Sequence, residues 1–170
     1  EQQIRRMLVD DRSKEFVTNF AGQWLYLRNL DNTFPDILDF PEFDDNLRQS
    51  FKDETMMLFD SIVREDRGLL TLLDADYTFV NERLAAYYGM PKVYGPRLRR
   101  VPITDPNRRG LLGQGSLMAV TSIANRTAPT MRGKWILTEL LSTPPPPPPP
   151  DLPNSLAKDD GGEAKSLRQV

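Results

Sequence analysis

The sequence predicts a mainly α-helical, bundle-like fold with a short β-strand or hairpin near residues 97–103 and a C-terminal polyproline segment. Apolar residues recur at helical spacing over most of the chain. The stretch RLRRVPI at 97–103 alternates instead, and seven consecutive prolines occupy positions 144–150. With 170 residues, of which 39% are hydrophobic, the chain is long enough to bury a sizeable core without a disulfide or a metal.

Two helices are expected near the N-terminus, at residues 1–9 and 12–28. In the second helix, four large apolar residues share one face because they recur at i, i+4, i+8 and i+11: Phe16, Phe20, Trp24 and Leu27. We interpret this stripe as core packing rather than as a platform for a ligand, so its aromatic residues are predicted structural anchors. Pro35 and Pro41 then predict a connecting loop.

The longest helix is expected at residues 44–65, with Asp44 or Asp45 capping its start. Its apolar arc is wide enough to contact more than one neighbouring helix, as in a bundle. The members of its buried stripe are Leu47, Phe51, Leu58 and Ile62.

The following stretch predicts three short elements. Residues 69–73 are expected to form a short helix, residues 74–80 a turn, and residues 81–88 another helix that ends at Gly89. Residues 91–107 then form a connector rich in proline and arginine, which contains the expected strand. Glycines near 113–115 suggest tight packing more than a phosphate loop, because the lysine of a phosphate loop is missing.

The last helix is expected at residues 131–141. Trp135 lies one turn from Met131 and is predicted to be a buried structural anchor, packed against the helix that contains Leu112, Leu117 and Val120. The prolines at 144–150 cannot continue this helix because they lack an N–H group. They are interpreted as a stiff spacer of roughly 20 Å, followed by a flexible linker to residue 170.

Composition restricts the chemistry of this chain. It contains no cysteine and no histidine, so it has no disulfide, no thiolate or imidazole metal ligand, no C-x-x-C-H haem attachment and no nucleophile paired with histidine. The net charge of −2 does not indicate a nucleic-acid partner, and no apolar run is long enough to span a membrane.

Candidate catalytic and binding residues are few. Asp76 and Glu82 are the candidates for a carboxylate-dependent enzyme, although turn and capping roles explain them as well. Arg126, Arg132 and Lys134 are candidate anion contacts, with salt bridges as the alternative. No metal site is predicted. A third reading is that the prolines dock to aromatic grooves of a partner.

Several long motifs in a fixed order resemble a known family. The stretches NFAGQWLYLRNLD, FPEFDDNLRQSFKDE, LLDADYTFVNERLAAYYGM, RRGLLGQGSLMAVTS and NRTAPTMRGKWILTELLSTPPPPPPPDLP resemble planctomycete cytochrome C domain proteins. In these proteins two domains of unknown function adjoin, fifteen-ninety-two and fifteen-eighty-eight. Here they correspond to residues 1–90 and 108–143, joined by the connector 91–107 and followed by the segment 144–170.

The resemblance implies a context rather than a reaction. It implies a helical scaffold or interaction module of a larger, exported or periplasmic redox protein with electron-transfer character. Covalent c-type haem is then expected elsewhere in the full-length protein and not in this segment, and the partners are expected to be other domains of the same chain. Many relatives carry His or Tyr where this sequence has Ile123, so this position is not expected to ligate haem here.

Overall fold

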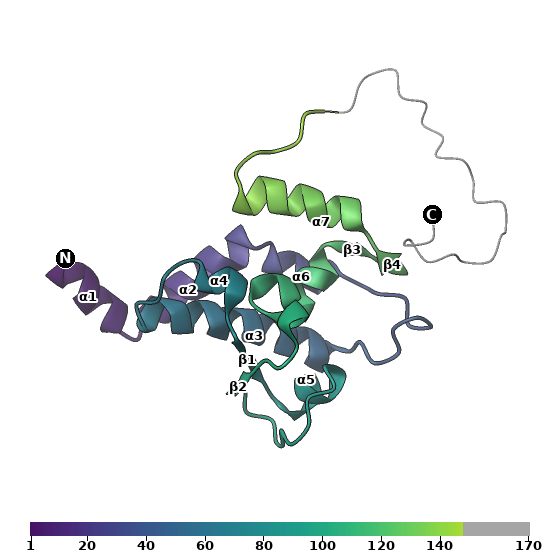
Figure 1. Cartoon of the computed structure of the whole chain (residues 1–170), viewed down its shortest axis with the longest axis horizontal. Coiled ribbons are helices and arrows are strands. Elements are labelled where there is room, and N and C mark those ends of the chain that lie inside the picture. The colour runs from purple at the N-terminus through teal and green to yellow at the C-terminus, as the bar shows by residue number, and fades with distance from the viewer. Residues whose placement is uncertain (148–170) are drawn as a thin grey trace.

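The computed structural model describes residues 1–147, and these residues are mainly helical with two small pairs of antiparallel strands (Figure 1). Helical periodicity and capping signals account for most of the helices. The α-helices are α1 (Gln2–Val9), α2 (Ser13–Trp24), α3 (Asp45–Arg64), α4 (Thr71–Asp74), α5 (Glu82–Tyr87), α6 (Gly115–Val120) and α7 (Pro129–Trp135). The 3₁₀-helices are η1 (Leu27–Asn32), η2 (Pro106–Arg108) and η3 (Leu111–Gly113).

Helix α3 runs through the middle of the molecule and confirms the prediction for residues 44–65 (Figure 1). Asp44 caps it, because its side chain accepts a hydrogen bond of 2.7 Å from the backbone N–H of Leu47. The predicted stripe is buried along its whole length. Helix α5 is capped in the same way by Asn81, and its chain turns at Gly89 with a positive φ of 69°.

Strand β1 (Tyr77–Val80) shows that the turn predicted at 74–80 is wrong. It pairs antiparallel with β2 (Arg99–Pro102), with Tyr77 opposite Pro102 and Val80 opposite Arg99. The strand near 97–103 is therefore confirmed, but its partner lies about twenty residues earlier and not in a local hairpin. All four residues of β1 are buried, so the alternation that identifies a half-exposed strand is missing from them.

A second pair, β3 (Ser122–Ile123) with β4 (Arg126–Thr127), forms a small hairpin between α6 and α7. The last helix begins at Pro129, and after Trp135 it continues as one π-helical segment, η4 (Ile136–Leu140). The N–H of Leu141 reaches the carbonyl of Ile136 at 3.1 Å. A bundle is not confirmed, and the predicted rod and linker lie largely outside the described residues.

One hydrophobic cluster joins the early and late parts of the chain. It contains Leu58 and Phe59 from α3 together with Leu111, Leu117 and Trp135. A second cluster surrounds Phe51 and Val80, with Leu30, Leu47, Leu84 and Ala85. The division into domains at 1–90 and 108–143 stays a prediction. In the described residues, side chains from both predicted domains pack together in these two clusters.

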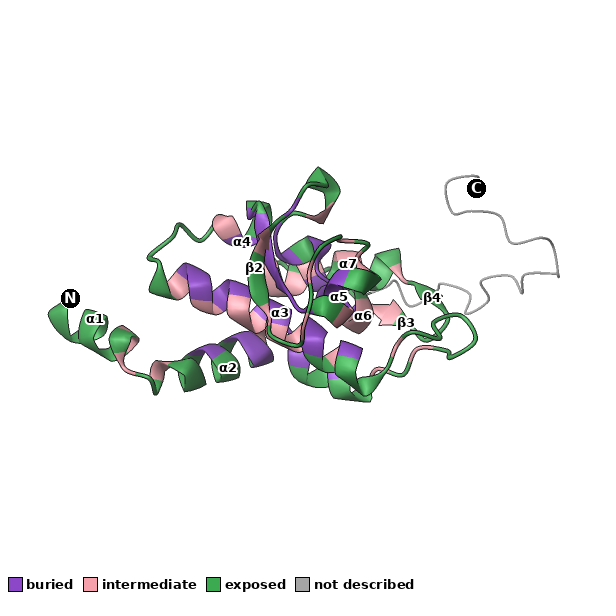
Figure 2. Ribbon diagram, turned by 90° about the horizontal axis from the view of Figure 1, so that it is seen from below, coloured by how far each residue is buried: buried purple, intermediate pink, exposed green. Residues whose placement is uncertain are grey.

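The aromatic stripe of α2 is only partly a core element. Phe16 and Phe20 are 52% and 47% exposed, so the prediction that they are buried anchors is wrong. The buried positions of α2 are instead offset by one and include Val17 and Ala21. The Phe20 ring still packs against Phe59 of α3, with 5.9 Å between the ring centres. Figure 2 shows that α1 is also mostly exposed. In the described part of the chain, no helix combines the length and the apolar character that a bilayer crossing requires.

The two tryptophans are structural. Trp24 is partly buried and donates from its indole nitrogen to the carbonyl of Glu139 at 2.9 Å. Trp135 is 9% exposed and belongs to the same cluster as Leu117, with Val120 packed beside it. Burial of Trp135 is thereby confirmed, whereas Leu112 lies in η3, outside α6, and is 37% exposed.

Candidate functional site

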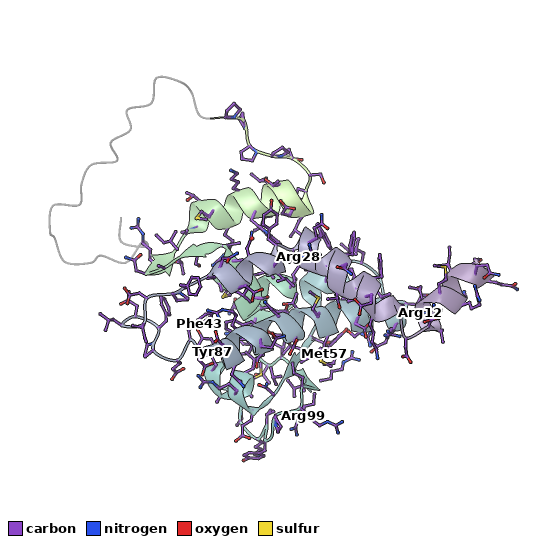
Figure 3. All side chains as sticks on the ribbon, turned by 180° about the vertical axis from the view of Figure 1, so that it is seen from behind. Arg12, Arg28, Phe43, Met57, Tyr87 and Arg99 are labelled. Atoms are coloured by element: carbon purple, nitrogen blue, oxygen red, sulfur yellow. The ribbon has the colours of Figure 1, made fainter. Side chains whose placement is uncertain are left out.

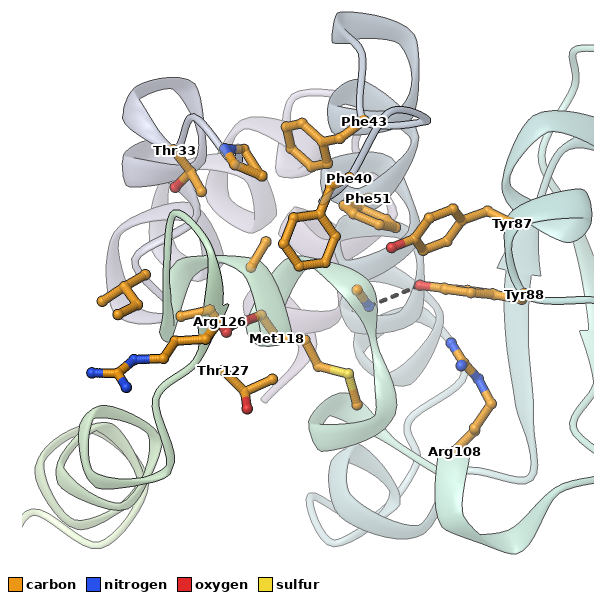
Figure 4. Close-up of a pocket in the computed structure, with 15 residues that line it drawn as sticks. Thr33, Phe40, Phe43, Phe51, Tyr87, Tyr88, Arg108, Met118, Arg126 and Thr127 are labelled. Atoms are coloured by element: carbon orange, nitrogen blue, oxygen red, sulfur yellow. Dashed lines mark hydrogen bonds between the residues drawn. The ribbon is translucent and has the colours of Figure 1, made fainter. Parts of the chain in front are cut away.

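A cavity of about 250 Å³ lies between the first half of α3, the end of α5, helix α6 and the β3–β4 hairpin. We call it the aromatic pocket. Its aromatic wall consists of Phe40, Phe43, Phe51, Tyr87 and Tyr88, and Met118, Ala119 and Ile123 face it from α6 and β3. Figure 4 shows the rings of this wall grouped on one side of the opening, with Met118 across from them. Such a mainly apolar concavity is the usual form of a small-molecule site.

Local sequence signals position this wall. Phe43 directly precedes the capping residue Asp44, and Tyr87 and Tyr88 stand at the end of α5, just before the turn at Gly89. Figure 3 shows Phe43 and Tyr87 close to one another, and both line the pocket. Gly115 closes the floor, because a Cβ there would lie 2.2 Å from Cε1 of Phe51. Only glycine allows α6 to approach α3 this closely.

A buried carboxyl group lies directly behind the pocket. Glu54 is 1% exposed and accepts hydrogen bonds from the Tyr88 hydroxyl at 2.6 Å and from Thr78 Oγ1 at 2.5 Å. The Tyr88 oxygen accepts in turn from the N–H of Gly115 at 2.8 Å (Figure 4). Burial raises the pKa of Glu54 to about 7, although these hydrogen bonds and the charge of Arg108 oppose the shift.

Burial also affects Tyr88. Its pKa lies well above the usual value, first because of burial and then because of the Glu54 charge. The phenol therefore keeps its proton near neutral pH. Tyr88 consequently acts as a fixed donor to Glu54 and presents its ring, not a phenolate, to the pocket.

A second buried polar group connects α3 with α6. The Thr55 hydroxyl lies 2.7 Å from Gln114 Oε1 and 2.6 Å from Ser116 Oγ. All three side chains are almost fully buried. Since buried polar groups are costly unless they are paired, these contacts fix the register of α6 against α3.

Arg108 supplies the positive charge of the pocket. Its guanidinium carbon lies 3.9 Å from the centre of the Tyr88 ring, within the range of a cation–π contact. Figure 4 shows Arg108 reaching up beneath this ring. Within residues 1–147, no carboxylate forms a salt bridge with Arg108, and its side chain makes no hydrogen bond.

Arg126 also lines the pocket, but its guanidinium extends away from the aromatic wall (Figure 4). The other two candidate anion contacts lie elsewhere. Arg132 donates to Thr121 Oγ1 at 3.2 Å, and Lys134 is exposed on α7. The three predicted cations thus have different surroundings. Three other arginines, Arg12, Arg28 and Arg99, lie far from one another in Figure 3 and form no cationic cluster there.

The candidate carboxylates Asp76 and Glu82 stand at opposite ends of β1. At about 3.3 Å per residue, six steps along an extended chain separate them by roughly 20 Å, more than the distance between paired glycosidase carboxylates. Glu82 accepts from the N–H of Gly95 at 2.6 Å. Both residues are exposed, and this arrangement does not favour a shared active site.

The residues of this chain do not fit a covalently attached haem, because the sequence contains no cysteine and no histidine. Residues 1–147 also contain no group of three or more acidic side chains placed to hold a metal ion. The prediction that this segment carries no cofactor remains a prediction.

Glu54 and the pocket are not among the sites predicted from the sequence. One signal was present: Glu54 follows Phe51 by three positions and precedes Leu58 by four, which places a carboxyl on the buried face of α3. The pocket itself had no local signal, since its walls come from segments far apart in the sequence. Ile123 lies in its lining.

Comparison with known families gives two matches. A model described as a protein of unknown function (DUF1592) matches residues 1–90, and a second, described as a protein of unknown function (DUF1588), matches residues 108–170. No curated protein and no solved structure matches the chain. The aromatic pocket takes Phe51 and Tyr88 from the first matched segment and Arg108 and Met118 from the second.

Proposed function

Because the chain belongs to the family of proteins of unknown function designated DUF1592, we propose that it is a helical scaffold and interaction module of a larger protein. That protein is an exported, haem-associated redox protein of the cytochrome c type. The order of the two family matches agrees with the resemblance to planctomycete cytochrome C domain proteins. Location in the periplasm and partnership with haem-bearing domains of the same chain follow from that resemblance.

The observation that carries the interaction role is the position of the aromatic pocket. It lies where the two family segments meet, so neither segment provides the whole wall. The buried Glu54–Tyr88–Gly115 contacts hold these segments together immediately behind it. A binding surface that depends on both segments supports a role for the pair as one unit.

The redox context is tested on the protein isolated from its source. Haem staining after denaturing electrophoresis and an intact-mass measurement should reveal covalent haem on the complete chain, at a position outside residues 1–170. If the complete protein carries no haem, the redox context is wrong, while the scaffold role is judged by its folding and by its contacts with the neighbouring domains.

Two alternatives remain open. A carboxylate-dependent enzyme using Asp76 and Glu82 is disfavoured by their placement at opposite ends of β1.

The proline-rich docking module is tested by replacing the prolines at 144–150 with an equally long Gly/Ser segment. Docking predicts that partner capture is lost, whereas a spacer predicts a changed distance between the flanking domains.

A further inference from the structure

We propose that the aromatic pocket is a binding site for a small aromatic carboxylate, whose ring lies among Phe40, Tyr87 and Tyr88 and whose carboxylate pairs with Arg108. This ligand site goes beyond the scaffold role and does not depend on haem elsewhere in the protein. It rests on the size of the cavity, on its aromatic wall and on the sign of its charge.

The size fits one ring with a short substituent. An apolar cavity of about 150 Å³ is enough to bind benzene, and the aromatic pocket measures about 250 Å³. Its lining is mostly apolar and includes the buried Phe51 and the more exposed Met118. An aromatic ligand would meet these rings at offset-stacked or edge-to-face geometry, which aromatic side chains favour.

The charge selects an anion. Two arginines line the pocket, and its lining contains no aspartate or glutamate. Arg108 is half-buried on the Tyr88 ring and, within the part of the chain that the structure describes, forms no salt bridge with a carboxylate. The charge of Arg108 acts on the Glu54 carboxyl, but this group lies behind Tyr88. It already accepts hydrogen bonds from the Tyr88 and Thr78 hydroxyls.

The ligand is a carboxylate because a single guanidinium faces the site. Arg126 extends away from the aromatic wall (Figure 4), so one cation rather than two is available beside the rings. The planar fork of a guanidinium matches a planar carboxylate with two parallel hydrogen bonds. Arg126 then contributes to the attraction only at longer range.

The test uses 4-fluorobenzoate and its neutral counterpart 4-fluorobenzamide, each titrated into the 170-residue chain and followed by ¹⁹F NMR. The carboxylate is expected to bind saturably and at least about fivefold more tightly than the amide. Replacement of Arg108 by glutamine should weaken the carboxylate about tenfold, or about 1.4 kcal/mol, and change amide binding less than about twofold.

Three further variants separate binding from folding. Arg109→Gln, at the exposed neighbouring position, is the matched control and should leave both affinities unchanged. Arg126→Gln should weaken the carboxylate about twofold, and it remains informative if Arg108→Gln does not fold. Ala119→Phe should fill the pocket and abolish binding of both compounds, with the folded state checked by circular dichroism.

Other results would overturn the proposal. They are equal affinity for carboxylate and amide, an equal loss in the Arg109 control, and an absence of saturable binding by both compounds. Displacement of the fluorobenzoate by a peptide of sequence TPPPPPPPDLP would mean that the pocket takes a proline-rich segment instead. The haem measurement on the complete protein is independent, so failure of this ligand site leaves the scaffold role standing.

Discussion

Tyr88 donates its hydroxyl hydrogen to the buried carboxyl of Glu54 across 2.6 Å, which joins the end of α5 to the middle of α3 directly behind the aromatic pocket. The same hydroxyl oxygen accepts from the first residue of α6. One side chain thus connects three helices that come from both family segments, and the stability of the pocket depends on it.

Glu54 should make the stability of the protein depend on pH. Its pKa rises from 4.5 in the unfolded chain to about 7 in the fold, so the native state binds the proton more tightly. The contribution of Glu54 to the free energy of unfolding is complete below about pH 4.5 and is lost as pH rises through 7. Between pH 5 and 8 the loss is on the order of 2 to 3 kcal/mol.

The measurement compares Glu54→Gln with the wild type by urea unfolding at several pH values. The variant should lack this loss, so its stability relative to the wild type should rise from pH 5 to 8. Glu15→Gln, at an exposed position on α2, is the control for a change of net charge. A stability difference between wild type and Glu54→Gln that stays constant with pH contradicts the assignment.

Tyr88→Phe removes one hydroxyl and keeps the ring beneath which Arg108 lies. The change leaves the Glu54 carboxyl with one donor fewer and the Gly115 N–H without its acceptor. We expect a loss of about 1 to 3 kcal/mol, since an unpaired buried polar group keeps its full desolvation cost. Tyr87→Phe, at a 40% exposed position, should change the urea midpoint little, and equal effects at both positions would count against the network.

Trp135→Ala should cost about 3 to 5 kcal/mol, a large part of the stability of a typical domain. The side chain is 9% exposed and packs in the cluster that contains Leu58 and Leu117. Met131→Ala, one turn earlier and 46% exposed, is the matched control. A shift below about 1 kcal/mol for Trp135→Ala in urea unfolding would contradict its role as a buried anchor.

Gly110→Ala and Gly133→Ala should have opposite effects. At Gly110 φ is +61°, and a Cβ would lie 2.3 Å from the carbonyl carbon of Leu73, so alanine should strongly destabilise the fold. At Gly133, inside α7, a Cβ would meet nothing within 4 Å. Alanine there should stabilise the protein by about 0.5 to 1 kcal/mol, and thermal unfolding of both variants compares them.

Most helices of this protein follow from signals close together in the sequence. The cap at Asp44, the stripe through Leu47 and Leu58 and the turn at Gly89 are local, and the structure confirms them. Strand β1 was missed because its four residues are all buried and its partner, β2, lies some twenty residues away. Phe16 and Phe20 were misplaced because spacing defines a helix face but not the partner that covers it.

By itself, the sequence determined the helical class, the longest helix with its cap, the burial of Trp135 and the absence of cysteine and histidine chemistry. Only the tertiary structure decided where β1 finds its partner, which face of α2 is covered and how Glu54, Tyr88 and Arg108 come together. The physical reason is the distance along the sequence over which each kind of interaction acts. Caps and periodicity act within a few residues, whereas the pocket and its buried carboxyl depend on contacts between segments that only folding makes neighbours.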